Sequence, residues 1–319
     1  MKRRRVLFIG GSLNQTRQMH AVSRELPDVE ALFTPFYGGA SMAFARRVGL
    51  IEAWIGGNKR RGWCLDYLAA HRLPIDLDGE RGGYDLVVTC TDLVIPNNVR
   101  GVPVVVVQEG IFDRDGVVAA LCRAAPGLPR WLAGTALTGE SGQYARFCAA
   151  SAGYRDRLRG LGVPGERVVV TGIPGFDDCR RYLTNDFPHR DYVLVCTSDG
   201  RETLKRDDRR HLVRRALGIA DGRPLVFKLH PNEDEPLRRR EILALAPHAL
   251  VFQKGSAEEM IANSELLITE WSSTVFVGMA LGKPVYSNFP APELRRLLPW
   301  QNGGTSAARI ATVCREVLS

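Results

Sequence analysis

The chain has 319 residues, of which 45% are hydrophobic and 24% are charged, a composition typical of a globular protein. This composition excludes a disordered or fibrous chain, and the length suits about two domains. Forty-three Lys and Arg residues stand against 35 Asp and Glu residues, which gives a formal net charge of +8. Such a surface favours anionic partners: nucleic acid, an anionic membrane or phosphate-bearing small molecules.

The cysteines and the N-terminus bear on the compartment. Seven cysteines are scattered along the chain without a Cys-x-x-Cys pair, which argues against a disulfide framework or a zinc knuckle. The first apolar run, residues 6–9, is too short for a signal peptide, and no run has the length of a membrane span. We expect a cytoplasmic protein and leave open a weak peripheral contact at the inner face of the membrane.

Short apolar runs bounded by Gly, Pro or Asp alternate with helical patterns through most of the chain. Strands are expected at residues 6–9, 31–34, 85–90, 102–107, 147–150, 168–171, 192–196, 225–229, 249–252, 266–269 and 284–286. Helices are expected at residues 16–25, 42–54, 151–161, 207–217, 236–245, 257–263, 274–281 and 306–318.

Continuous apolar strands between helices indicate parallel sheets that are covered on both faces. Two such series predict an α/β protein with two Rossmann-like, doubly wound domains that face each other across a cleft. We place the N-terminal domain at residues 1–178 and the C-terminal domain at residues 179–319, with the last helix either there or packed back on the first domain. Ligands of open α/β sheets bind beyond the carboxyl ends of the strands, so functional residues are expected there.

Three strand ends in the first half carry candidate ligand-binding residues. Gly10, Gly11 and Ser12 follow the first strand and precede a helix, and the pair Gly10-Gly11 either makes a tight turn with left-handed geometry or approaches a ligand. Glu109 follows the strand at residues 102–107, where a carboxylate is either a general base or a solvated loop acid. Gly172 follows the strand at residues 168–171, and its backbone either approaches a ligand or only makes a turn.

The strand at residues 225–229 contains Lys228 and leads directly into His230 and Pro231. An imidazole at this place can hydrogen-bond a phosphate oxygen or protonate a leaving phosphate. We favour this role over a structural one because the residue stands at a strand end. The other histidines lack this context, and no spacing of ligands predicts a metal site.

A hydroxyl-rich segment, Glu270-Trp-Ser-Ser-Thr274, follows the strand at residues 266–269 and opens a helix. One hydroxyl is enough to cap a helix. The additional hydroxyls of Ser272, Ser273 and Thr274 favour an anion site, because the free N–H groups of a helix start bind phosphate. Glu270 either accepts hydrogen bonds from a ribose or sugar hydroxyl or stabilises its own loop.

Taken together, these motifs resemble glycosyltransferases of the GT-B architecture, in particular bacterial sialyltransferases, capsule Kdo transferases and teichoic acid glycerophosphate polymerases. That branch carries an acidic pair before Gly, a His-Pro motif and a Ser-Ser motif, which are matched here by Gln108-Glu109-Gly110, His230-Pro231 and Ser272-Ser273. Residues 170–177 are similar to a Thr-Gly-x-Pro-x-x-Asp run that this branch shares with non-hydrolysing nucleotide-sugar 2-epimerases. The chain departs from the pattern at Gln108, where the branch has an acid.

The resemblance implies a metal-independent glycosyltransferase without a cofactor, which moves a sugar from a nucleotide-activated donor to a glycan or lipid-linked acceptor. It implies that the first domain binds the acceptor, that Glu109 deprotonates it, and that His230 binds or protonates the departing phosphate. The second domain would bind the nucleotide-sugar. The residues expected to hold the donor are Gly11, Ser12, Gly172, Lys228, His230, Pro231, Glu270, Ser272, Ser273 and Thr274.

Two other enzymes remain alternatives. A non-hydrolysing UDP-sugar 2-epimerase shares the fold and the run at residues 170–177. Epimerases of this kind need several acids for elimination and re-addition, and here Glu109, Asp113 and Glu270 are present without the paired acids expected beside the Ser motif. A CDP-glycerol-type glycerophosphotransferase is the other alternative.

A basic nucleic-acid-binding protein is the alternative from another class. Basic stretches at residues 2–5, 59–61 and 205–215 motivate it. The last stretch also holds Asp207 and Asp208, so it resembles a solvated helix face. Because the sequence contains no recognised nucleic-acid module, we expect no nucleic-acid partner.

Overall fold

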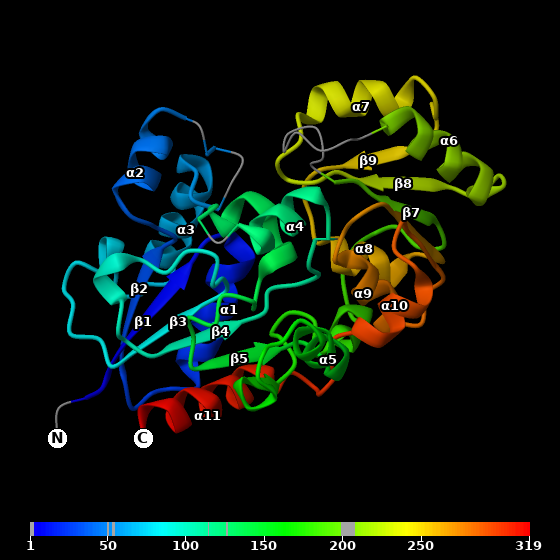
Figure 1. Cartoon of the computed structure of the whole chain (residues 1–319). Coiled ribbons are helices and arrows are strands. Elements are labelled where there is room, and N and C mark those ends of the chain that lie inside the picture. Colours follow the sequence, from blue (N-terminus) through cyan, green and yellow to red (C-terminus); the bar gives the residue numbers. More distant parts are fainter. Residues whose placement is uncertain (1–2, 50, 53–54, 114, 126, 199–207) are drawn as a thin grey trace. The chain divides into compact units, whose positions relative to one another are not determined.

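The computed structural model describes residues 3–49, 51–52, 55–113, 115–125, 127–198 and 208–319 (Figure 1). The chain divides into two compact units, Met1–Asp177 with Asn302–Ser319, and Asp178–Gln301. Each unit contains one sheet with helices packed on it, and every strand pairing between the named strands is parallel. The expected α/β fold with two doubly wound parallel sheets is therefore confirmed.

The first unit has a six-stranded sheet in the order β2-β1-β3-β4-β5-β6. Its strands are β1 (Arg5–Gly10), β2 (Glu30–Pro35), β3 (Leu86–Thr89), β4 (Val104–Val107), β5 (Arg146–Ala149) and β6 (Val168–Val170). The strands are fully apolar at their centres because helices cover both faces. The strand order reverses between β1 and β3, and the loops after these strands are where such a sheet binds ligands.

Six α-helices accompany this sheet in the described part of the first unit. They are α1 (Leu13–Arg24), α2 (Ala40–Arg47), α3 (Asn58–Ala70), α4 (Val117–Ala124), α5 (Ala152–Gly160) and α11 (Ser306–Leu318). Helix α1 contacts both α3 and α11, and these three helices bury one continuous apolar cluster against the sheet. Short 3-10 turns lie at Leu77–Gly79, Asn97–Val99, Arg130–Leu137 and Gly165–Arg167.

The last helix belongs to the first unit although the chain reaches it from the second. The backbone N–H of Ser306, at the start of α11, donates to Asp177 Oδ2 at 3.0 Å, and Asp177 is only 1% exposed. The N–H of Asn302 donates to the backbone oxygen of Asp177 at 2.8 Å. Residues 302–319 thus pack with the first unit, the second of the two arrangements considered for the final helix.

The second unit has a five-stranded sheet in the order β11-β10-β7-β8-β9. Its strands are β7 (Val193–Cys196), β8 (Leu225–Lys228), β9 (Leu250–Phe252), β10 (Leu266–Thr269) and β11 (Val285–Tyr286). Its helices are α6 (Arg209–Ala220), α7 (Glu235–Leu243), α8 (Ala257–Asn263), α9 (Thr274–Ala280) and α10 (Ala291–Leu297), with a 3-10 turn at Cys179–Leu183. The strand order reverses between β7 and β10, as in a Rossmann sheet, which makes the loops after these strands the expected ligand site.

All eleven expected strands are present, whereas the expected helices are only partly correct. The helix expected at residues 42–54 is wrong, because α2 ends at Arg47 and Gly49 follows with a left-handed φ of 78°. Its last expected residue, Trp54, lies outside the described residues, as do residues 205–207 of the basic stretch. Helices α3, α4 and α10 were not expected from the sequence.

The described segments contain no helix that is both long enough and apolar enough to cross a membrane. All seven cysteines are buried thiols, in keeping with the expected absence of a disulfide framework.

Candidate functional site

Glu109 follows β4 in the first unit, and side chains of α1 hold its carboxylate. Ser12 Oγ donates to Glu109 Oε1 at 2.6 Å, and Gln15 Nε2 donates to Oε2 at 2.5 Å. Gln18 Nε2 donates to the backbone oxygen of Glu109 at 3.2 Å. Each carboxylate oxygen therefore has a neutral donor, and the half-buried group is fixed in orientation at the carboxyl end of the sheet.

The three donors come from one face of α1, since they are spaced three residues apart along the helix. Ser12 is also the N-cap of α1, and its Oγ accepts from the backbone N–H of Gln15 at 3.1 Å. The same hydroxyl thus starts the helix and orients Glu109. The sequence-predicted residues Ser12 and Glu109 are brought together, whereas Gln15 and Gln18 were missed.

Gly10 and Gly11 are small because α1 lies against them. A Cβ atom on Gly10 would lie 2.6 Å from Thr16 Oγ1, and one on Gly11 would lie 2.3 Å from Gln15 Oε1. Gly10 is the last residue of β1 and has extended backbone, so the left-handed turn considered for this pair is wrong there. The two glycines make room for the side chain that holds Glu109. The expected contact between Gly11 and a nucleotide-sugar stays a prediction.

Gln108, which stands where the resembling families have an acid, is fully buried and uses both ends of its amide. Its Oε1 accepts from the backbone N–H of Ala150 at 2.9 Å, and its Nε2 donates to the backbone oxygen of Gly110 at 2.7 Å. A carboxylate could not donate the second bond. Gln108 therefore fixes the ends of β4 and β5, and it is not an acid–base group.

Cys90, the residue after β3, is buried beside this cluster and its Sγ lies 3.7 Å from Gln18 Oε1. Burial raises the pKa of the Cys90 thiol well above its ordinary value, and the nearby Glu109 carboxylate raises it further. The thiol therefore stays neutral and serves as a weak donor.

Two further acids of the first unit are occupied by backbone N–H groups. Asp92 is 2% exposed and accepts from the N–H of Gly139 at 2.8 Å and of Ser141 at 3.0 Å. Asp113 accepts from the N–H and the hydroxyl of Thr135 at 3.1 and 2.9 Å. Both carboxylates order loops after the strands, and of these three acids only Glu109 has a carboxylate held by side chains without a backbone N–H.

Gly172 lies in the turn after β6, away from the Glu109 cluster. Its φ of 73° is in the left-handed region, which explains the glycine without a ligand. Asn302 Nδ2 donates to the backbone oxygen of the preceding residue, Thr171, at 3.1 Å. The expected contact between Gly172 and a nucleotide-sugar stays a prediction.

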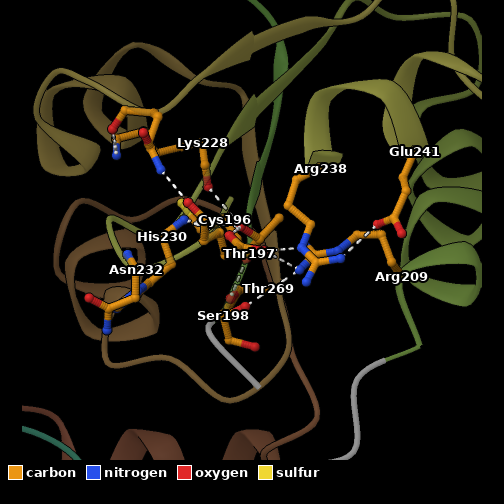
Figure 2. Close-up of polar contacts among 12 residues, drawn as sticks. Cys196, Thr197, Ser198, Arg209, Lys228, His230, Asn232, Arg238, Glu241 and Thr269 are labelled. Atoms are coloured by element: carbon orange, nitrogen blue, oxygen red, sulfur yellow. Dashed lines mark hydrogen bonds and ion pairs between the residues drawn. The ribbon is translucent and has the colours of Figure 1, made fainter. Parts of the chain in front are cut away.

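In the second unit, His230 follows β8 in a tight turn that closes on itself (Figure 2). Its backbone N–H donates to Glu233 Oε2 at 2.7 Å and to Thr197 Oγ1 at 3.2 Å. The N–H of Asn232 donates to His230 Nδ1 at 3.2 Å. Because Nδ1 accepts, the proton of the neutral ring is on Nε2, the nitrogen that can donate to a phosphate oxygen. Pro231 restricts the backbone within this turn.

Lys228 is the last residue of β8 and is only 6% exposed. Its Nζ donates to the backbone oxygens of Leu229 at 3.0 Å and of Gln253 at 2.7 Å (Figure 2). Burial lowers the pKa of this ammonium. Lys228 thus connects the end of β8 to the segment after β9. Its direct contact with a nucleotide-sugar stays a prediction.

The hydroxyl-rich segment forms the loop between β10 and α9. Ser272 Oγ accepts from the N–H of Thr274 at 3.3 Å and from its hydroxyl at 3.0 Å. Ser273 is the N-cap residue, but its side chain makes no capping bond. One of the three hydroxyls therefore serves the helix start, and the anion role of Ser272, Ser273 and Thr274 stays a prediction. The backbone oxygen of Glu270 accepts from the N–H of Asn288 at 3.2 Å.

The end of β7 joins these two loops. Thr269 Oγ1 donates to the backbone oxygen of Cys196 at 2.8 Å, and the residue after Cys196 is Thr197, which contacts His230. Burial raises the pKa of the Cys196 thiol to about 12, partly offset by Lys228 and a hydrogen bond with Thr274. Adjacent strands are about 4.8 Å apart, so the ends of β8 and β10 lie about 10 Å apart, a span that a nucleoside diphosphate can bridge.

The described residues contain no group of three or more His, Cys, Asp or Glu side chains that could hold a metal ion. In the first unit, the candidate residues form a carboxylate held by a hydroxyl and an amide. In the second unit, they are an imidazole and the hydroxyls of the loop before α9. Of the residues that sequence reasoning missed, Thr197 could have been found by the strand-end rule, and Gln15 and Gln18 by their spacing on one helix face.

No protein-family model matches the sequence, and no curated protein matches it either. Solved structures match in fold. UDP-GlcNAc 2-epimerase from Neisseria meningitidis, bound to UDP-GlcNAc, shares 12% identity over 98% of this chain and 99% of its own, with a TM-score of 0.59. Staphylococcus aureus MnaA with UDP shares 14% identity over 99% of this chain and 88% of its own, with a TM-score of 0.60.

The wall teichoic acid polymerase TagF also matches, with 10% identity over 99% of this chain and 88% of its chain, and a TM-score of 0.52. At such identities the likeness establishes the fold alone. The chain therefore has the two-unit GT-B-type α/β fold found in UDP-GlcNAc 2-epimerases and in TagF. The finer resemblance to the branch with His-Pro and Ser-Ser motifs is not confirmed.

Proposed function

We propose that the protein is an enzyme that acts on a nucleotide-activated sugar. Its nucleotide phosphates would bind at the ends of β8 and β10, with His230 Nε2 donating to a phosphate oxygen and the Ser273 hydroxyl at the start of α9. Glu109 would be the acid–base group. The observation that carries the proposal is the fixed His230 ring, whose Nδ1 accepts from Asn232 and whose proton is thereby kept on Nε2.

Fixed orientation matters because a hydrogen bond to a phosphate is strongest when the donor is already in place before the ligand arrives. The turn around His230 is closed by its own backbone and by Glu233, so little rearrangement is needed. Ser12 and Gln15 likewise fix the orientation of the Glu109 carboxylate.

For the reaction itself, we propose epimerisation at C2 of a UDP-GlcNAc-type sugar nucleotide as the first candidate. UDP-GlcNAc 2-epimerases recur among the structural neighbours, and the Neisseria meningitidis enzyme is matched over 99% of its length. No separate acceptor is needed, so the reaction requires only the sugar nucleotide and acid–base groups.

Transfer of a sugar or glycerophosphate to a glycan or lipid-linked acceptor is the second candidate. One observation favours it: of the three acids Asp92, Asp113 and Glu109, the first two order loops through backbone N–H groups, which leaves Glu109 as the candidate general base among them. A single general base suffices to deprotonate an acceptor hydroxyl, whereas elimination and re-addition call for more than one acid–base group. The neighbour TagF, a polymerase, has the same fold.

Proton NMR of UDP-GlcNAc incubated with the protein alone in D2O tests the proposal. Epimerisation predicts a C2-epimeric sugar nucleotide with deuterium at C2. Glu109→Gln should slow its formation by about 10²- to 10⁴-fold, whereas the exposed control Glu166→Gln should leave it unchanged. Unchanged UDP-GlcNAc, together with nucleotide release only when an acceptor is added, would replace the first candidate by the second. No binding and no turnover of any CMP-, CDP-, UDP- or dTDP-linked donor would contradict the whole proposal.

A further inference from the structure

A buried ion pair lies behind the turn that carries His230. Arg209, the first residue of α6, pairs with Glu233, and their side chains are 2% and 0% exposed. The other carboxylate oxygen of Glu233 accepts from the backbone N–H of His230 at 2.7 Å and from the hydroxyl of Thr197. Figure 2 shows Arg209 and Arg238 on one side of this network and His230 on the other.

The carboxylate of Glu233 connects the ends of β7 and β8, and the backbone of the same residue reaches the end of β9. Arg209 also donates to the backbone oxygen of Ser198 at 3.4 Å, just after β7. The N–H of Glu233 donates to the backbone oxygen of His230 at 3.1 Å, which closes the turn after β8. Gln253 Nε2, just after β9, donates to the backbone oxygen of Glu233 at 2.7 Å. The ends of β7, β8 and β9 are thus held around one residue, Glu233, whose charged group binds the first two.

Stability alone is a weak reason for this arrangement. Removing two charges from water costs free energy that their attraction often fails to recover, and apolar residues of the same volume commonly serve stability as well or better. The pair does supply an ionised carboxylate, which accepts from the His230 N–H more strongly than a neutral group would. It thereby fixes the backbone from which the imidazole projects.

We propose that Glu233 and Arg209 are positioning residues, which keep the His230 imidazole oriented for the phosphate of the nucleotide substrate. This inference rests on the proposed function, in which His230 contacts that phosphate. Without the Glu233 charge, the His230 N–H loses its strongest acceptor, the turn opens, and the N–H of Asn232 no longer fixes Nδ1. The ring then samples both neutral tautomers and other rotamers.

The variant Glu233→Gln tests the proposal, because the amide can fill the same space without the charge. We expect a fall of about 10²-fold in kcat/KM for the sugar nucleotide, in line with a small misplacement of a ligand-contacting group. We also expect the imidazole 15N signals of His230 to move from the pattern of a protonated Nε2 toward a tautomer mixture. The matched control is Glu235→Gln, because the carboxylate of Glu235 pairs with Arg239 on the surface of α7.

A second variant, Arg209→Lys, keeps the positive charge but loses the planar guanidinium that pairs with Glu233. It serves as the test variant if Glu233→Gln fails to fold. Variants that melt at a lower temperature, yet show wild-type His230 signals and wild-type kcat/KM while folded, would overturn the proposal. If wild-type protein binds no nucleotide, the proposed function fails. The NMR comparison still decides positioning in that case, because it needs no substrate: shifted His230 signals support it, and unchanged ones reject it.

Discussion

The two units orient their key side chains by different means. In the first, neutral side chains of α1, Ser12 and Gln15, hold the half-buried carboxylate of Glu109. In the second, backbone groups and the buried Arg209–Glu233 pair hold His230. In the first unit the charged group is Glu109 itself, at the edge of the sheet. In the second unit the orientation of His230 depends on the buried carboxylate of Glu233.

This difference separates function from stability. A half-buried carboxylate with neutral donors can be replaced by its amide at little cost to the fold, because the amide oxygen can still accept from the buried Gln15. A buried ion pair cannot be broken without leaving an uncompensated charge. Substitutions at Glu109 should mainly change activity, and substitutions at Arg209 should change stability as well.

The largest effect is expected from Glu109→Gln. Loss of the acid–base group should lower turnover of the sugar nucleotide by about 10²- to 10⁴-fold, while the melting temperature stays close to that of the wild type. Steady-state kinetics and calorimetry on the same preparation check both parts. A large drop in melting temperature with normal turnover would show that Glu109 serves stability and not activity.

Arg209→Met should destabilise the second unit by about 3 kcal/mol, the low end for a broken buried pair, because the Glu233 carboxylate loses its closest ion-pair partner but keeps Arg238 at 3.9 Å. The control Arg239→Met removes an exposed ion pair with Glu235 and one hydrogen bond to the Val251 backbone oxygen, and should cost about 1 kcal/mol. Urea denaturation of both variants gives the two values. Equal costs would show that burial does not distinguish the pairs.

Alkaline pH should destabilise both units through their buried thiols. Burial raises the folded-state pKa of Cys196 from an ordinary value of 9.0 to about 12, and raises that of Cys90 as well. Above pH 9 the unfolded chain releases the proton and the folded chain keeps it. The stabilising contribution is therefore complete below about pH 9 and is lost as the pH rises toward 12.

Each such thiol should steepen the fall of unfolding free energy by about 1 kcal/mol per pH unit in this range. Cys196→Ala should remove that increment from denaturation curves recorded between pH 9 and pH 10. A slope that is unchanged in the variant would mean that Cys196 ionises as readily in the folded protein as in the unfolded chain.

The smallest effect is expected from Ser12→Ala, which removes an N-cap and one donor to Glu109. Loss of the cap should cost about 1 kcal/mol, and Ser12→Thr should restore most of it. Because Gln15 still holds the other carboxylate oxygen, turnover should fall far less than in Glu109→Gln. A loss of turnover equal to that of Glu109→Gln would make Ser12, and not only Glu109, essential.

The fold was largely predictable because short apolar runs bounded by Gly, Pro or Asp mark buried parallel strands. Helix boundaries were less predictable, since α2 ends where Gly49 takes a left-handed conformation that the pattern of residues 42–54 hides. Strand-end reasoning predicted Glu109 and His230 as site residues, and the structure places them after β4 and β8. It could not find Arg209 or assign Lys228 to backbone oxygens, because such contacts depend on packing between segments distant in sequence.

The central claim, that a nucleotide phosphate binds at the ends of β8 and β10, is tested most directly by titrating 15N-labelled protein with UDP, CMP, CDP and dTDP. We predict that the tightest-binding nucleotide shifts the amide signals of His230 and of Ser272–Thr274 together, along with the imidazole 15N signal of Nε2. Saturable shifts confined to other residues, or no saturable shift with any of the four nucleotides, would contradict the claim.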